Sequence, residues 1–290
     1  MLSNRKTTGK LIDERQIAMV TNLKQQAHVL RRTILDMVYR AGSGHIGGSL
    51  SSAEIMAVLY FHEMRIDPRM PRWQERDRFV LSKGHATPVY YAALAHRGFF
   101  PVETLEGFRK MGSILQGHPD CKHIPGVDMC SGALGQGGSA AVGMALAAKL
   151  KAENHRVYAL LGDGEVQEGQ VWEACMFAAH RKLDNLCLII DNNDVQSDGR
   201  IGDVNSPYPI DQKLVAFNFN VITVDGHDVD ALQAAFDAAR LEKGRPTAVI
   251  AKTVKGKGVS FMEGQAGWHG KAPNRQEYEM AVEELERAGV

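Results

Sequence analysis

The chain lacks an excess of charge of either sign. Its 290 residues include 34 Lys plus Arg and 34 Asp plus Glu, so the formal net charge at pH 7 is +0. Proteins that bind nucleic acid need a basic surface to neutralise phosphates, and this chain has no excess of basic residues over acidic ones. The composition therefore predicts no nucleic-acid partner.

Long apolar runs and a cysteine framework are also missing. No stretch of 18 consecutive apolar residues occurs, and the first 16 residues (MLSNRKTTGKLIDERQ) contain no apolar core of a signal peptide. These absences predict neither a membrane partner nor secretion. The four cysteines show no disulfide spacing, so a cytoplasmic location is expected; they are Cys121, Cys130, Cys175 and Cys187.

What the sequence does contain is an alternation of short apolar runs with helical patterns. A hydrophobic content of 44% can fill a sizeable core. The expected strands are 78–82, 156–161, 186–190, 220–225 and 246–252. The expected helices are 21–41, 51–63 with Ser51 or Ser52 as its cap and Glu54 in a capping box, 88–98, 101–110, 139–153, 168–182, 229–243 and 275–289.

This alternation predicts an α/β fold: a doubly wound, mostly parallel sheet with helices on both faces. We expect residues 1–20 to form a polar lead-in and residues 21–290 to form a single domain.

Two polar pairs follow neighbouring strands of the predicted sheet. Gly162, Asp163 and Gly164 come directly after the apolar run 156–161, and Asn192-Asn193 follows the next run. Because the carboxyl ends of parallel strands meet at one edge of a sheet, these pairs should lie together. A carboxylate, an amide and glycines that permit close approach suit a hard cation holding phosphate oxygens. Either pair taken alone would also fit an ordinary turn that binds no ligand.

Four histidines stand beside glycines in predicted loops rather than on helical stripes. They are His45 (SGHIGG), His85 (SKGHATP), His118 (QGHPD) and His269 (GWHG). One such histidine would ordinarily face solvent, but four in similar contexts on one side of a sheet predict a shared pocket.

The span from Gly162 to Asn193, GDG with NN about 30 residues on, resembles the thiamine-diphosphate fingerprint. Seven contexts, in order, resemble the transketolase family: SGHIGGSLS, FVLSKGHATP, QGHPD with PGVD, SGALGQG, GDGEVQEG, IIDNND and GWHG. The similarity extends from about residue 25 to 275. It implies the thiamine-diphosphate-binding fold and the transfer of a two-carbon ketol unit from a ketose phosphate to an aldose phosphate.

The resemblance also implies roles for individual residues. Contacts to thiamine diphosphate would come from His85, Gly132, Ala133, Leu134, Gly162, Asp163, Gly164, Asn193 and His269. Asp163, Asn193 and the carbonyl of Val195 would bind Mg²⁺, with Ca²⁺ or Mn²⁺ as substitutes. His45, His118 and His269 would face substrate, and Glu168 would join an acid network that reaches a dimer interface. Ala133 departs from the family, which often has proline there.

The chain resembles only the first domain of a full transketolase. The family's second domain supplies a glutamate that hydrogen-bonds the aminopyrimidine of the cofactor, and no segment here corresponds to it. The resemblance therefore implies the N-terminal subunit of a split transketolase, paired with a C-terminal subunit in an α2β2 assembly.

Other functions remain open at this stage. The α subunit of a 2-oxoacid dehydrogenase also carries GDG and NN, although a 2-oxoacid needs fewer imidazole partners. Residues 194–205 partly resemble a calcium loop, with Asn205 where a bidentate Glu is needed. His118, Cys121, His123 and Cys130 have a spacing that fits no common zinc pattern. Lys252, Lys255 and Lys257 form a basic cluster that suits either a diphosphate or a solvated loop.

Overall fold

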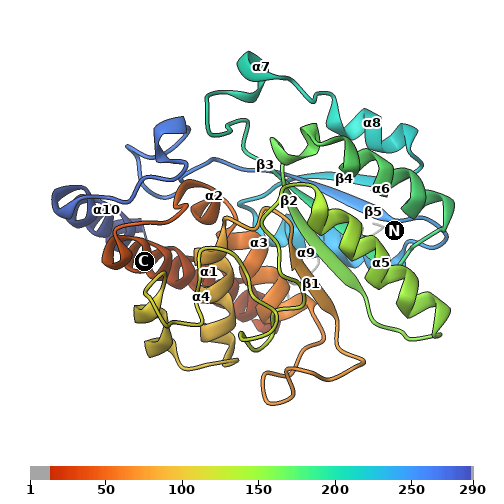
Figure 1. Cartoon of the computed structure of the whole chain (residues 1–290), viewed down its shortest axis with the longest axis horizontal. Helices are drawn as coiled ribbons and strands as arrows, with labels where there is room; N and C mark the ends of the chain where they lie inside the picture. The colour runs from red at the N-terminus through yellow and green to blue at the C-terminus, as the bar shows by residue number, and fades with distance from the viewer. Residues whose placement is uncertain (1–13, 289–290) are drawn as a thin grey trace, which may run out of the picture.

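The computed structural model describes residues 14–288 (Figure 1). Its strands are β1 (Arg78–Leu81), β2 (Val157–Gly162), β3 (Leu186–Asn192), β4 (Asn220–Asp225) and β5 (Thr247–Lys252). Its helices are α1 (Glu14–Ala41), α2 (Gly47–Leu50), α3 (Ala53–Val58), α4 (Thr87–Arg97), α5 (Gln136–Leu150), α6 (Gly169–His180), α7 (Ile201–Val204), α8 (Ile210–Ala216), α9 (Val229–Leu241) and α10 (Arg275–Ala288).

The five strands form one sheet in the order β1-β2-β3-β5-β4, and every pair is parallel. The register aligns the strand ends, since Gly162 pairs with Asp191 and Asn192 pairs with Lys252. The residues that follow β2, β3 and β5 therefore emerge at the same edge. The doubly wound parallel sheet expected from the alternation of elements is confirmed.

The sheet separates two apolar layers, which are visible as helices on its two sides (Figure 1). Along β2, Tyr158 and Leu160 pack with the layer that contains α1, α3, α4 and α9. Val157, Ala159 and Leu161 pack with the layer of α5, α6 and α8. Because both faces are covered, the central strands are continuously apolar rather than alternating. The expected helices on both faces are thus present.

Four local expectations differ from the structure. The expected helix at 101–110 is a short 3₁₀ helix at Val102–Gly107. Helix α1 begins at Glu14, so it extends into the expected polar lead-in; residues 1–13 lie outside the described residues. Helices α7 and α8 lie where no helix was expected. The helix after Ser52 runs from Ala53 and closes with a π turn at Leu59–Glu63, but no serine side chain caps it.

The capping expectation fails because tertiary partners compete for the serines. The Ser52 hydroxyl donates to the Gly48 carbonyl (3.0 Å), and Lys83 Nζ donates to Ser52 Oγ (2.6 Å). Ser51 Oγ donates to Asp191 (2.7 Å), and Glu54 pairs with Arg31 instead of the helix N-terminus. Among the described residues, no helix is long and apolar enough to cross a membrane.

Candidate active site

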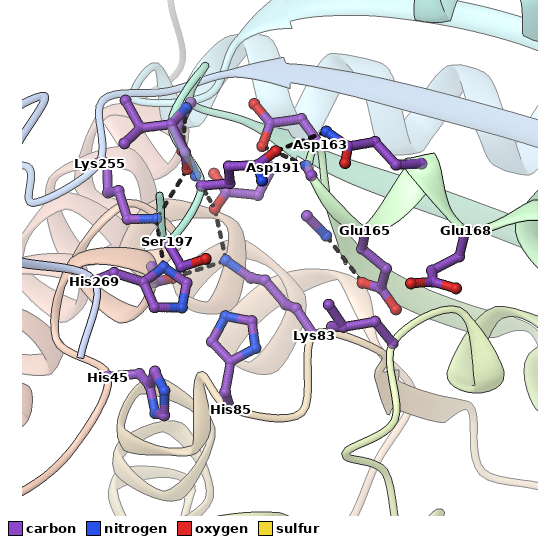
Figure 2. A pocket seen from close by; sticks show the side chains of 18 of the residues that line it. His45, Lys83, His85, Asp163, Glu165, Glu168, Asp191, Ser197, Lys255 and His269 are labelled. Atoms are coloured by element: carbon purple, nitrogen blue, oxygen red, sulfur yellow. Dashed lines mark hydrogen bonds and ion pairs between the residues drawn. The ribbon is translucent and has the colours of Figure 1, made fainter. Parts of the chain in front are cut away.

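A cavity of about 510 Å³ lies at the carboxyl edge of the sheet (Figure 2). Loops after β1, β2, β3 and β5 contribute to it, as does the loop between α1 and α2. The predicted site residues line it together, with the exception of Ala133: His45, His85, His118, Gly132, Leu134, Gly162, Asp163, Gly164, Glu168, Asn193, Val195 and His269. The volume suits a cofactor of moderate size.

Asp163, which follows β2, is buried in this cavity. Its Oδ1 accepts from Gly164 N (2.9 Å), and its Oδ2 accepts from Asp194 N (2.6 Å) and Asn192 Nδ2 (3.0 Å). Burial and then the charge of Asp191 raise the pKa of Asp163 to about 6. The carboxylate is oriented by neutral donors, and a bound cation would favour its charged form.

Asp191, at the end of β3, is also buried but has a cation beside it. Lys83 Nζ lies 2.6 Å from its Oδ2, and Ser51, Thr253 and Asn193 donate to the same carboxylate. Burial alone would raise the pKa of Asp191, yet Lys83 and these donors hold it below its usual value. The pair joins the end of β3 to the loop after β1.

The oxygen atoms near Asp163 fit a hard cation. Asn193 and Val195 line the same cavity, and carboxylate, amide and carbonyl oxygens are the ligands that Mg²⁺ and Ca²⁺ prefer. The Val195 carbonyl accepts from Lys255 Nζ (2.9 Å), which leaves its second lone pair for a metal. A Cβ built on Gly164 would lie 3.2 Å from Gln196 Cβ, so a side chain there would crowd the loop.

Three histidines form a triangle at the other end of the cavity. The ring centroids of His45, His85 and His269 are 5.0 to 5.3 Å apart. Burial is the main cause that lowers their pKa values, to about 4 for His45, about 2 for His85 and about 3 for His269, with neighbouring cationic groups adding to it. All three imidazoles are therefore neutral near pH 7, and each can both donate and accept a hydrogen bond.

Lys255 connects the two ends. Its buried Nζ lies 2.9 Å from the Val195 carbonyl and 2.9 Å from His269 Nδ1. Burial lowers the pKa of Lys255 to about 8, so the amine remains mostly charged near pH 7. An ammonium that donates to Nδ1 fixes the His269 tautomer with its proton on Nε2.

The remaining predicted residues border the cavity. His118 lies against the loop that carries Gly132, since a Cβ on Gly132 would be 3.2 Å from His118 Cδ2. Glu168 is exposed at the start of α6. Glu165, which the sequence reasoning did not select, is the buried acid here: it accepts from Ser82 Oγ (2.5 Å), Gly135 N (2.8 Å) and Gly162 N (3.1 Å).

Sequence reasoning also missed Lys83 and Asp191, and it left Lys255 between two interpretations. Both Lys83 and Asp191 stand inside quoted motifs, SKGHA and IIDNND, next to residues that were selected. Their sequence signal is a charged residue at the end of an apolar strand. Of the three clustered lysines, the structure buries Lys255 in the cavity, which contradicts the solvated-loop interpretation for that residue.

The calcium-loop and zinc interpretations find little support in the described residues. β3, a strand, precedes residues 194–205, and Asp194 pairs with Arg200. His118 lines the cavity, whereas Cys121 and Cys130 lie at the surface with Asp120. These three residues form the only group of at least three metal-capable side chains found within residues 14–288.

Comparison with known proteins agrees with this geometry. The family described as "Transketolase, thiamine diphosphate binding domain" matches residues 23–286. A 6-deoxy-6-sulfo-D-fructose transketolase subunit of Clostridium sp. (strain MSTE9) is 45% identical over 93% of this chain and 98% of its own length. One of the subunits of the apulose-4-phosphate transketolase of Phocaeicola vulgatus is 40% identical over 92% of this chain and 94% of its own length.

Full-length transketolases match over part of their length. Mouse transketolase is 45% identical, and the chain covers 42% of it. The transketolase structure from Leishmania mexicana superposes with a TM-score of 0.87 at 34% identity, covering 91% of this chain and 41% of that one.

Fold and site thus define the class, a thiamine-diphosphate-binding α/β domain. The chain belongs to the transketolase family, where it corresponds to an N-terminal, half-size subunit. These relatives favour a transketolase subunit over the 2-oxoacid dehydrogenase alternative.

Proposed function

We propose that this subunit holds thiamine diphosphate through Mg²⁺ and transfers a two-carbon ketol unit from a ketose phosphate to an aldose phosphate, in an α2β2 assembly with a C-terminal subunit. The observation that carries the proposal is the single cavity with oxygen ligands at one end and three neutral imidazoles at the other.

At the oxygen end, Asp163, Asn193 and the Val195 carbonyl would bind the cation. Gly162 and Gly164 leave room for diphosphate oxygens beside it. Lys255 and Lys83 place two ammonium groups on the wall of the same cavity, where they favour an anionic ligand. The interpretation of Lys255 as a diphosphate partner is therefore the one we adopt.

At the imidazole end, the residues handle oxygens and protons of the sugar. When bound, thiamine diphosphate supplies a thiazolium carbon that adds to the ketose carbonyl and stabilises the negative charge left by cleavage. His269 presents Nε2–H as a donor, because Lys255 faces Nδ1. His45 and His118, both on the cavity wall, would bond the hydroxyls of the ketol unit.

The names and lengths of the relatives support a separate partner subunit. The chain resembles the diphosphate-binding domain of transketolase, and both bacterial relatives are named as subunits. Apolar side chains are exposed on the layer of α5 and α6: Leu150 is 72% exposed, Met176 54% and Phe177 45%. Such side chains suit an interface, and Glu168 on the same side would extend the acid network toward it.

The substrate class rests on the relatives and on the histidines. The relatives' names indicate a sulfonated sugar, 6-deoxy-6-sulfo-D-fructose, in one case and a sugar phosphate, apulose-4-phosphate, in the other. We propose a ketose with an anionic group far from the carbonyl, as in pentose phosphate metabolism. A cytoplasmic location remains the expectation drawn from cysteine usage.

The test combines the purified chain with the glutamate-bearing subunit, thiamine diphosphate and Mg²⁺. Ketol transfer from a ketose phosphate to an aldose phosphate should appear, followed by mass spectrometry of the product sugars. Decarboxylation of a 2-oxoacid in the same mixture serves as the control reaction. Decarboxylation without ketol transfer would overturn the proposal.

A further inference from the structure

Two exposed thiols lie against each other in the segment between His118 and Gly132, which both line the cavity. Cys121 Sγ and Cys130 Sγ are 2.9 Å apart, and both residues are exposed. Cys121 N also donates to Cys130 Sγ (3.2 Å). Non-bonded sulfurs normally stay farther apart, and a disulfide needs about 2.05 Å, so less than about 1 Å of movement separates this contact from a bond.

The segment between the two cysteines is anchored, so the thiols are held together rather than meeting by chance. Ile124 and Val127 are buried in the core. Asp128 forms a buried ion pair with Arg76 (2.6 Å), and Gly126 adopts a φ of 85° against Phe99. A preorganised loop loses little conformational entropy when its ends are joined.

A metal is the competing occupant of this cluster, because Asp120 and His123 lie nearby. Two thiolates on one tetrahedral Zn²⁺ would be about 3.8 Å apart, given Zn–S bonds of about 2.3 Å. The observed 2.9 Å is shorter, and His123 Nδ1 already bonds Asp120 Oδ2 at 2.6 Å with its side chain 65% exposed. The sulfur contact therefore favours an S–S bond over shared ligation.

We propose that Cys121 and Cys130 form a reversible disulfide that slows the enzyme. One thiol, as its thiolate, attacks a peroxide oxygen, which gives a sulfenic acid and water; the second attacks that sulfur, which gives the disulfide and a second water. The two sulfurs lose two electrons in total, and hydrogen peroxide accepts them. A dithiol reverses the step by thiol–disulfide exchange.

The chain connects this bond to the cavity. Cys121 lies three residues after His118, and Cys130 lies two residues before Gly132. Gly132 leaves little room beside the His118 ring, since an added Cβ would lie 3.2 Å from His118 Cδ2, and Ser131 Oγ donates to the Leu81 carbonyl (2.5 Å). Drawing the sulfurs together moves the two loops relative to each other at the substrate side. The sulfurs approach each other by less than about 1 Å, so the loops shift by less than that, and turnover should fall by roughly 10-fold rather than the 10²-fold of a full 1 Å misplacement.

The experiment uses the reduced chain, assembled with its partner subunit, then treated with hydrogen peroxide. Peptide mapping should show a Cys121–Cys130 link and the loss of two thiols. Ketol transfer should fall about 10-fold and return with dithiothreitol. Cys130→Ser should abolish both the link and the fall, whereas Cys175→Ser, which removes a buried thiol elsewhere, should retain both.

The link is read by mass alone, so it can be judged even if the proposed ketol transfer fails. Absence of a Cys121–Cys130 link after peroxide overturns the proposal. A link that leaves turnover unchanged overturns its regulatory part. Binding of one Zn²⁺ per reduced chain, lost in Cys130→Ser and protective against peroxide, would replace the disulfide with a metal site.

Discussion

Burial shifts the titratable groups at the two ends of the cavity in opposite directions, each toward its uncharged form. Around Asp163, burial and a neighbouring carboxylate raise a carboxyl pKa to about 6; around His85, burial and Lys83 lower an imidazole pKa to about 2. The contribution of Asp163 to stability is present at low pH and is lost as pH rises from about 3.8 toward about 6. That of His85 is present above about 6.5 and is lost as pH falls below it.

The two ends also differ in the charged groups that surround them. The Asp163 carboxylate accepts hydrogen bonds from neutral donors, whereas Lys83 forms its ion pair with Asp191. Cationic groups dominate around the imidazoles, with Asp198 acting in the opposite sense on His269. A cation bound at the Asp163 end would offset the charge of the carboxylate. A polar, uncharged group bound at the histidine end would exchange hydrogen bonds with the neutral imidazoles. The cavity is thus polarised before any ligand binds.

The largest expected effect tests whether the two ends suffice without the partner. On its own, the purified chain should show no ketol transfer, because neither end offers the glutamate that activates the cofactor. Adding the glutamate-bearing subunit should restore activity, and native mass spectrometry should show an α2β2 particle. Robust transfer by this chain alone, with no companion detected by mass, would falsify the split-subunit interpretation.

The imidazole end should affect turnover more than binding. His269→Ala should lower the rate of ketol transfer by about 10²-fold, the scale of one positioned acid–base group. His62→Ala, at an exposed histidine outside the cavity, is the matched control. Steady-state kinetics of the assembled enzyme gives the measurement; a His269→Ala enzyme as fast as wild type would place this histidine outside the reaction.

The oxygen end should affect binding. Asp163→Ala should weaken Mg²⁺ and thiamine diphosphate together, by at least about 10-fold, because a charged ligand is lost. Asp211→Ala, at an exposed acid of α8 outside the cavity, should leave the affinity near wild type. Calorimetric titration with the partner present distinguishes the two variants. Equal cofactor affinity in Asp163→Ala and wild type would contradict the assignment.

The smallest expected effect is the pH dependence of stability without cofactor. Between pH 7.5 and 5.5 the unfolded chain protonates His85 while the folded chain does not, so unfolding free energy should fall by about 1 kcal/mol from this residue. His85→Gln should remove that part of the fall. Urea titrations at the two pH values measure it, and an equal fall for the variant and wild type would contradict a buried neutral His85.

The sequence predicted the fold well because parallel strands leave strong local signals. The run 186–190 is apolar on both faces, and Asp163 and Asn193 follow strands directly, so their meeting is a consequence of topology. Lys83, Asp191 and Glu165 were not selected, since their burial depends on partners more than 25 residues away, such as Ser82 for Glu165 and Lys83 for Asp191. The capping role expected for Ser52 is wrong for the same reason, because Ser52 Oγ bonds the Gly48 carbonyl and Lys83 Nζ in the folded chain.

The cavity draws on residues from His45 to His269, so nearly the whole length of the chain must be in place before it exists. Fragments that keep only β2, α6 and β3 would retain GDG and NN yet have no imidazole end. Thiamine diphosphate binding therefore requires nearly the whole chain to be folded, and its measurement reports complete folding. In deletion series or refolding experiments, recovery of cofactor affinity should mark the moment when the first and last loops have met, later than recovery of helical content.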